Sequence, residues 1–196
     1  MKSSFVWGVV LLAAASSAQA QVKWDSPFLI SPRPSPGVGL FLVDLDGPGA
    51  GVGALITWQP SPTSWGFRGG IVESAVEDLA VVFGADVSGA ITRSTTDMPL
   101  DIDWVFGVGL GVDDDVVVSL PVGITMGHTF SGEGALFTPY LTPRVILDAW
   151  FGDRNETLDL EFAVDLGLDL RLRGNWTIRF GGTIGNREAI AIGLVL

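Results

Sequence analysis

The sequence has no cysteine, so neither a disulfide nor a thiolate-bound metal can hold its fold together. It is also poor in bases. Lysine occurs only at Lys2 and Lys23, and 11 bases stand against 22 acids, which gives a net charge of -11. Binding to nucleic acid requires clustered Lys and Arg that neutralise phosphates. This balance therefore argues against a nucleic-acid partner.

No apolar run is long enough for a membrane-spanning helix, which needs about 20 residues. The apolar run at residues 5–15 follows Lys2 and leads into small residues that end with Ala20. A basic start, an apolar middle and a small-residue site are typical of a secretory signal peptide, so we expect residues 1–20 to be removed. Subtracting these 20 residues from 196 leaves 176, a size that suits a single domain.

Residues 21–36 contain four prolines, from Pro27 to Pro36. Proline has no backbone N–H for a sheet ladder, so this stretch cannot form a central strand. We interpret it as a stiff, exposed periplasmic linker. The folded domain is then expected to span residues 37–196.

From residue 37 onward, apolar side chains alternate with small or charged ones. In the clearest case, every second residue from Leu158 to Leu172 is Leu, Phe or Val, and the residues between are Asp, Glu, Ala, Gly and Arg. A period of two gives a strand one apolar face and one polar face. An amphipathic helix would repeat its apolar residues with a period near 3.6, so a strand is predicted.

The same period recurs along the chain and predicts about ten strands. An even number is typical of bacterial membrane barrels, and the 47% hydrophobic content with 26 glycines fits them. We therefore predict an all-β protein, a closed antiparallel transmembrane β-barrel of about ten strands in meander order, with eight strands as the alternative. The predicted strands span residues 37–45, 51–59, 65–72, 79–87, 102–112, 116–126, 137–151, 158–172, 176–184 and 188–196.

The large apolar side chains are expected to face lipid. A soluble barrel would place them inside and cover its outside with Lys, Thr and Glu. Here the alternate face is rich in Gly, Ala and Ser with scattered charges, which suits a narrow lumen. These charges favour an ion-pair network that fills the barrel, and a selective pore or a cation site is the alternative. The predicted lumen network consists of Arg68, Asp86, Asp103, Arg144, Asp148, Asp159, Glu161, Asp165, Asp169, Arg171 and Arg179.

The two rims of the predicted barrel differ in chemistry. If both barrel ends of the chain are periplasmic, the turns after every second strand are periplasmic too, and they carry an aromatic girdle. The girdle consists of Trp58, Trp65, Trp104, Phe130, Phe137 and Trp176. The opposite connections are acidic, with Arg154 and Arg187 as their bases, and we expect divalent cations to link them to lipopolysaccharide. The acids are Asp44, Asp46, Glu73, Glu77, Asp78, Asp113, Asp114, Asp115, Asp153 and Glu156.

Two motifs invite a chemical interpretation. The run Asp113–Asp115 is a weak candidate for a calcium or magnesium site, but such runs are more often solvated turns, and no metal is predicted. His128, with Ser131 and Glu133 nearby, invites comparison with serine-type lipid A deacylases, which are also small outer-membrane barrels. Because the spacing does not match the close His and Ser pair of that family, a histidine at the membrane interface is preferred. We predict no catalytic residues, no cofactor and no enzymatic activity.

Residues 167–178, with the sequence GLDLRLRGNWTI, resemble the strand-turn-strand pattern of small outer-membrane barrel proteins of the OmpA and opacity type. Residues 136–141 are similar to another recurring stretch of that superfamily. The resemblance implies a location in the bacterial outer membrane, with lipopolysaccharide and the barrel assembly machinery as partners. It departs from the pattern at Leu196, where such barrels usually finish on an aromatic residue.

Together these features predict an outer-membrane barrel with a structural or surface-interaction role and a lumen filled by side chains. The alternative is a porin-like channel for ions or small solutes. Lipid hydrolysis is a third and less favoured hypothesis.

Overall fold

The computed structural model describes residues 23–45, 51–62, 65–73, 79–113, 115–152, 157–172 and 176–196. The predicted signal peptide lies outside these ranges, as do Arg154 and six of the predicted rim acids. Within the described ranges, no helix is long and apolar enough to cross a membrane. The six acids outside the described ranges are Asp46, Glu77, Asp78, Asp114, Asp153 and Glu156.

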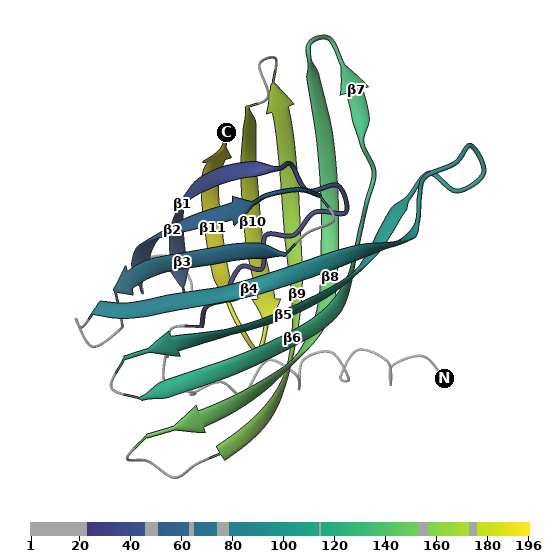
Figure 1. Cartoon of the computed structure of the whole chain (residues 1–196). Coiled ribbons are helices and arrows are strands. Elements are labelled where there is room, and N and C mark those ends of the chain that lie inside the picture. Colours follow the sequence, from purple (N-terminus) through teal and green to yellow (C-terminus); the bar gives the residue numbers. More distant parts are fainter. Residues whose placement is uncertain are drawn as a thin grey trace, which may run out of the picture.

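The structure is a closed antiparallel barrel of ten strands in meander order (Figure 1). Strands β1 to β6 pair in chain order, as do β8 to β11, and pairing of β1 with β11 and of β6 with β8 completes the ring. The short strand β7 pairs only with β8 and extends one hairpin beyond the ring. The strands are β1 (Gly37–Leu45), β2 (Val52–Gln59), β3 (Gly66–Glu73), β4 (Leu79–Thr92), β5 (Asp101–Val112), β6 (Val116–Gly127), β7 (Phe130–Gly132), β8 (Ala135–Phe151), β9 (Thr157–Leu172), β10 (Thr177–Gly185) and β11 (Ala189–Val195).

The predicted fold class is confirmed, with ten strands rather than the alternative eight. The prediction succeeded because most strands keep a strict period of two. In β5, for example, every second residue from Asp101 to Gly111 is buried inside, and the residues between point outward. One unpredicted element is β7, whose three residues are too few to show a period.

The barrel has two rims, which differ in the turns that they carry. The terminal rim is the one at which β1 begins and β11 ends, and it also carries the β2–β3, β4–β5 and β9–β10 turns and the hairpin of β7 with β8. The far rim carries the remaining turns. The six predicted girdle aromatics all lie at or near the terminal rim, and all are exposed: Trp58, Trp65, Trp104, Phe130, Phe137 and Trp176.

The predicted exposed linker is wrong for most of the part that the structure describes, because residues 24–32 are buried inside the barrel and only Arg33 and Pro36 of residues 23–36 are exposed. The purple trace of this segment runs between the walls in Figure 1, and Trp24 and Phe28 are completely buried. The prolines do prevent a strand, as expected, but they do not place the segment in solvent. A barrel wider than about eight strands encloses more space than its own side chains fill, and the apolar residues of the segment occupy that space.

We call residues 23–36 the lumen segment. At one end, Lys23 bonds to Glu161 of β9 close to the far rim. At the other end, Ser35 lies 3.2 Å from the hydroxyl of Thr177, at the start of β10 on the terminal rim. The lumen segment therefore runs the length of the barrel before the chain enters β1.

Glycines of the barrel wall make room for the lumen segment. A Cβ atom added at Gly109 would lie 2.5 Å from the ring of Trp24, one at Gly107 would lie 2.8 Å from it, and one at Gly84 would overlap the same ring. These glycines point inward from β4 and β5. The wall is thus shaped to the bulk of Trp24, and a side chain at these positions would exclude it.

We predict that Gly84→Ala destabilises the protein by about 1–3 kcal/mol, because the added methyl group overpacks the Trp24 ring. Urea unfolding of the protein folded in lipid vesicles measures the change. Gly69→Ala is the matched control on β3, since its Cβ would point outward with no atom nearer than 3.7 Å. The penalty at Gly84 should vanish in a Trp24→Ala background, and equal effects of the two glycine substitutions would contradict this packing.

Candidate functional site in the barrel lumen

The centre of the lumen holds a buried carboxylate, Asp25, between two arginines. Arg144 of β8 donates from Nη1 to the Asp25 carboxylate and from Nη2 to its backbone carbonyl at 3.0 Å. Arg187, from the turn between β10 and β11, donates to the other carboxylate oxygen. All three side chains are almost completely shielded from solvent. Asp25 therefore connects the lumen segment to β8 and to the turn between β10 and β11.

Each of these arginines also has a carboxylate partner in the wall. Arg144 Nε donates to Asp165 of β9 at 2.6 Å. Arg187 donates from Nη2 to Asp148 at 2.5 Å and from Nε to Glu161 at 2.8 Å. Charge-assisted bonds of this kind hold guanidinium groups in fixed orientations.

Towards the far rim, Lys23 completes the cluster. Its Nζ lies 2.5 Å from Glu161 and 3.4 Å from Asp148, and 5.7 Å from the centre of the Trp150 ring. Four carboxylates thus share three bases, which are Lys23 and the two arginines. Burial of so many charges is tolerated only when they are paired, because an unpaired buried charge loses its hydration.

Midway along the lumen, Arg68 of β3 anchors the aromatic part of the lumen segment. Its guanidinium carbon lies 5.3 Å from the Trp24 ring centre and 5.2 Å from that of Phe28, within cation–π range. It donates to the carbonyls of Pro27 and Phe28 at 3.2 and 2.5 Å. It also pairs with Asp86 of β4 at 2.9 Å. Two backbone carbonyls of the segment, those of Pro27 and Phe28, thereby have partners without a sheet ladder.

Asp165 and Arg179 satisfy further backbone groups of the segment. Asp165 accepts a bond from the N–H of Phe28 at 3.1 Å. Arg179 of β10 forms a two-pronged pair with Asp169, at 2.6 and 2.7 Å, and donates to the Leu29 carbonyl at 2.7 Å. The backbone at Leu29 is in the left-handed region, with φ at 56°, which an L-residue adopts only where its surroundings fix it.

Near the terminal rim the segment leaves the lumen through a second group of ion pairs. Arg33 pairs with Asp101 at 2.8 Å, and Arg93, just after β4, forms a two-pronged pair with Asp103. The pKa of the Arg93 guanidinium is raised chiefly by this hydrogen bond to Asp103. Arg171 donates to the Ser35 hydroxyl at 2.7 Å.

Most residues of the predicted lumen network face the lumen, where they form several separate groups. Asp159 lies on the same face of β9 as Glu161 and Asp165, but it is exposed near the start of the strand and lies outside these buried groups. Arg187, predicted as a base of the rim, is instead buried in the central cluster. Sequence reasoning missed six lumen charges: Lys23, Asp25, Arg33, Arg93, Asp101 and Arg187.

One sequence signal could have revealed the lumen segment. Four large apolar residues occur among its prolines, and a solvated linker has no use for them: Trp24, Phe28, Leu29 and Ile30. A second signal is the run of inward glycines at positions 107, 109 and 111, since a wall without side chains needs a filling from elsewhere.

The lumen has little space left once the segment is in place. A polar cavity of about 40 Å³ remains near the terminal rim, lined by residues that include Thr57, Arg68, Asp86 and Ser88. This volume holds one or two water molecules. A cavity of this size does not by itself form a passage along the lumen.

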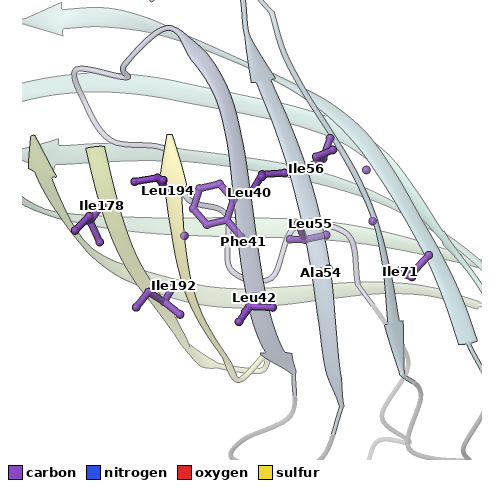
Figure 2. Close-up of a pocket in the computed structure, with 13 residues that line it drawn as sticks. Leu40, Phe41, Leu42, Ala54, Leu55, Ile56, Ile71, Ile178, Ile192 and Leu194 are labelled. Atoms are coloured by element: carbon purple, nitrogen blue, oxygen red, sulfur yellow. The ribbon is translucent and has the colours of Figure 1, made fainter. Parts of the chain in front are cut away.

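Figure 2 shows a hollow in the outer face. It lies over β1–β3 and β10–β11 and is lined by apolar side chains such as Leu40, Ile56, Ile71 and Ile192. Ala54 and Gly69 also point outward there, and their small size creates the hollow. Its lining carries no charged group.

The deacylase hypothesis finds no support in the geometry. His128 stacks edge-on against Phe130, with ring centres 4.5 Å apart, and its buried Nδ1 has no hydrogen-bond partner. Ser131 and Glu133 are exposed in the hairpin of β7 and β8. Among these described residues, no hydrogen bond joins the histidine to the serine or the glutamate.

The weak metal candidate is only partly described. Asp113 and Asp115 are half-buried in the turn between β5 and β6, and Asp114 lies outside the described residues. No group of three or more His, Cys, Asp or Glu side chains that could hold a metal ion occurs in the part of the chain that was described. Asp44 and Glu73 lie at the far-rim ends of β1 and β3.

No protein-family model and no curated protein matches the chain. Its function is therefore inferred from the distribution of its charged and apolar side chains.

We predict that loss of the Asp25 charge destabilises the protein less than loss of the Arg144 charge. Asp25→Asn should cost about 1–3 kcal/mol, because Arg144 and Arg187 each keep a wall carboxylate. Arg144→Met should cost about 3–5 kcal/mol, because it leaves Asp165 and Asp25 each short of a base. Urea unfolding in lipid vesicles gives both values. Arg171→Met is a control that loses only its bond to Ser35, and a larger loss for Asp25→Asn than for Arg144→Met would refute this assignment.

Proposed function

We propose that this protein is an integral barrel of the bacterial outer membrane, with a structural or surface-interaction role and a closed lumen. The observation that carries the proposal is the inverted distribution of side chains. Every one of the ten barrel strands exposes at least two large apolar side chains on its outer face. Eleven charged residues, by contrast, are buried inside: Asp25, Arg68, Asp86, Asp101, Asp103, Arg144, Asp148, Asp165, Asp169, Arg179 and Arg187.

Hydrocarbon is the solvent that suits this outer face. On the outward side of the described strands, only Asp44 and Glu73 are charged, and both lie at strand ends by the far rim. Strands β4, β5, β6, β8 and β9 are 12 residues or longer, whereas about 9–11 tilted residues cross a bilayer. Exposed rings at the terminal rim match the aromatic belt of a membrane interface.

The hypothesis of export and envelope partners follows from the same location. Residues 1–20 would direct secretion, lipopolysaccharide would contact the outer face, and the barrel assembly machinery would insert the protein. Acids near the far rim, Asp44 and Glu73 among them, would attract divalent cations at anionic headgroups. The resemblance to the OmpA and opacity type supports the architecture of this proposal and no specific activity.

We predict that Leu166→Arg weakens folding into a bilayer by about 2–4 kcal/mol, the cost of a base on the lipid face near the membrane midplane. Leu166 lies in the central part of β9 and is 50% exposed. Reversible refolding into phospholipid vesicles measures the loss. Ser131→Arg, on an exposed hairpin at the terminal rim, is the control and should change little. A tolerated Leu166→Arg would indicate a water-facing surface.

We further predict that the intact protein gives no steady current when inserted in a planar bilayer. The lumen segment and the paired charges fill the lumen, and the residual cavity of about 40 Å³ does not pass ions. Insertion is checked independently by heat-modifiable mobility on a detergent gel. A steady current through inserted protein would favour the porin-like alternative.

A further inference from the structure

We propose that the lumen segment is a removable plug, and that the barrel without it is an open pore that prefers cations. The inference rests on the proposed membrane-spanning role and adds a conditional transport function to it. Four features of the wall support it, namely its ladder, its ion pairs, its glycines and its charge balance.

The hydrogen-bonded ladder of the barrel is complete without the plug. Every barrel strand pairs with two neighbours, and the ring closes through β1 with β11 and β6 with β8. Among the described residues, the segment 23–36 forms one hydrogen bond between backbone groups, and it lies within the segment, from the Ser26 N–H to the Lys23 carbonyl. Withdrawal of the segment therefore breaks no strand pairing.

Most wall arginines that face the plug also keep carboxylate partners when it is absent. Five wall arginines that contact the segment or line its path each have a wall carboxylate partner as well. These pairs are Arg68 with Asp86, Arg93 with Asp103, Arg144 with Asp165, Arg179 with Asp169, and Arg187 with Asp148 and Glu161. Withdrawal of the segment therefore leaves none of these five guanidinium groups unpaired.

The plug is fixed to the wall covalently only through Gly37, where β1 begins. Its other contacts are apolar burial and side-chain hydrogen bonds to the wall, both charged and neutral, and ordering its fourteen residues costs conformational entropy that opposes them. Asp25 is the one side chain that binds two wall arginines at once. Its carboxylate is therefore the group that we expect to control whether the plug stays.

The space that the plug leaves would not be filled by the wall. Trp24 lies on glycines of β4 and β5, and Leu29 lies on Gly181 of β10. A glycine has no side chain that could move into the vacated volume, and closed barrels keep their diameter because it is set by strand number and register. Water and ions would enter instead.

The charge of the open lumen would favour cations. In the described residues, the wall contributes seven acids and six arginines, and withdrawal of the plug removes Lys23, Arg33 and Asp25, a net positive charge. Asp101 then loses its partner Arg33. Carboxylates in excess make a pore cation-selective. The acids counted are Asp86, Asp101, Asp103, Asp148, Glu161, Asp165 and Asp169, and the arginines are Arg68, Arg93, Arg144, Arg171, Arg179 and Arg187.

The test uses the full chain with a plug that cannot stay in place, the variant Trp24→Gly/Asp25→Asn/Phe28→Gly. After insertion in a planar bilayer under a KCl gradient, this variant should carry a steady current where the natural protein carries none. Its reversal potential should be shifted toward the equilibrium potential of potassium. A synthetic peptide of residues 23–36 should reduce the current. The same peptide with alanine in place of Trp24 and Phe28 should not.

A matched control variant carries Trp104→Gly and Phe130→Gly, two exposed aromatics outside the lumen, and should stay silent. The proposal is overturned if the plug variant inserts, as shown by flotation with vesicles and heat-modifiable mobility, and carries no current, or if its current is anion-selective. If the plug variant alone fails to insert, the single variant Asp25→Asn is tested by the same current measurement. Brief channel openings are expected, and the absence of any current would refute the proposed plug. If the natural protein fails to insert as well, the proposed membrane location fails instead.

Discussion

The space enclosed by ten strands governs the rest of this structure. A barrel of about eight strands can fill its lumen with the side chains of its own wall, and a wider ring cannot. Glycines on the inner face of β4 and β5 enlarge the space that the side chains of the wall leave unfilled. The lumen segment fills it, so the position of Trp24 and Phe28 follows from the number of strands as much as from their own hydrophobicity. Inside a membrane, a closed ring is also the one sheet that leaves no backbone group unpaired.

Filling the lumen with a chain segment brings buried polar groups, and the ion pairs answer that need. The lumen segment has no strand neighbours, so its carbonyls and N–H groups require side-chain partners. Arg68 and Arg179 bond to its carbonyls, and Asp165 accepts one of its N–H groups. Each of these three residues also forms an ion pair with a residue of the wall. One network therefore stabilises both the barrel and the segment inside it. The charged lumen is thus a consequence of an irregular backbone enclosed by a sheet.

The sequence allowed the barrel to be predicted almost strand by strand, because alternation records which face each residue occupies. The edges of β5, β6 and β9 were predicted within one residue of those observed. Many of the lumen charges could be predicted for the same reason, since Asp165, Asp169 and Arg179 stand at inward positions of regular strands. Asp25 and Arg187 could not, because they lie on a coil and a turn that have no period. Proline was correctly understood to exclude a strand, but it carries no information on burial.

The contacts of the lumen segment are spread around the ring, and this has a consequence for how the protein folds. Trp24 packs on β4 and β5, Arg68 comes from β3, and Arg144 and Arg187 come from β8 and from the turn before β11. No continuous half of the chain supplies them all. The binding place of the segment is therefore assembled only when the first strand meets the last, so residues 23–36, which precede every strand in the chain, are among the last to reach their final position.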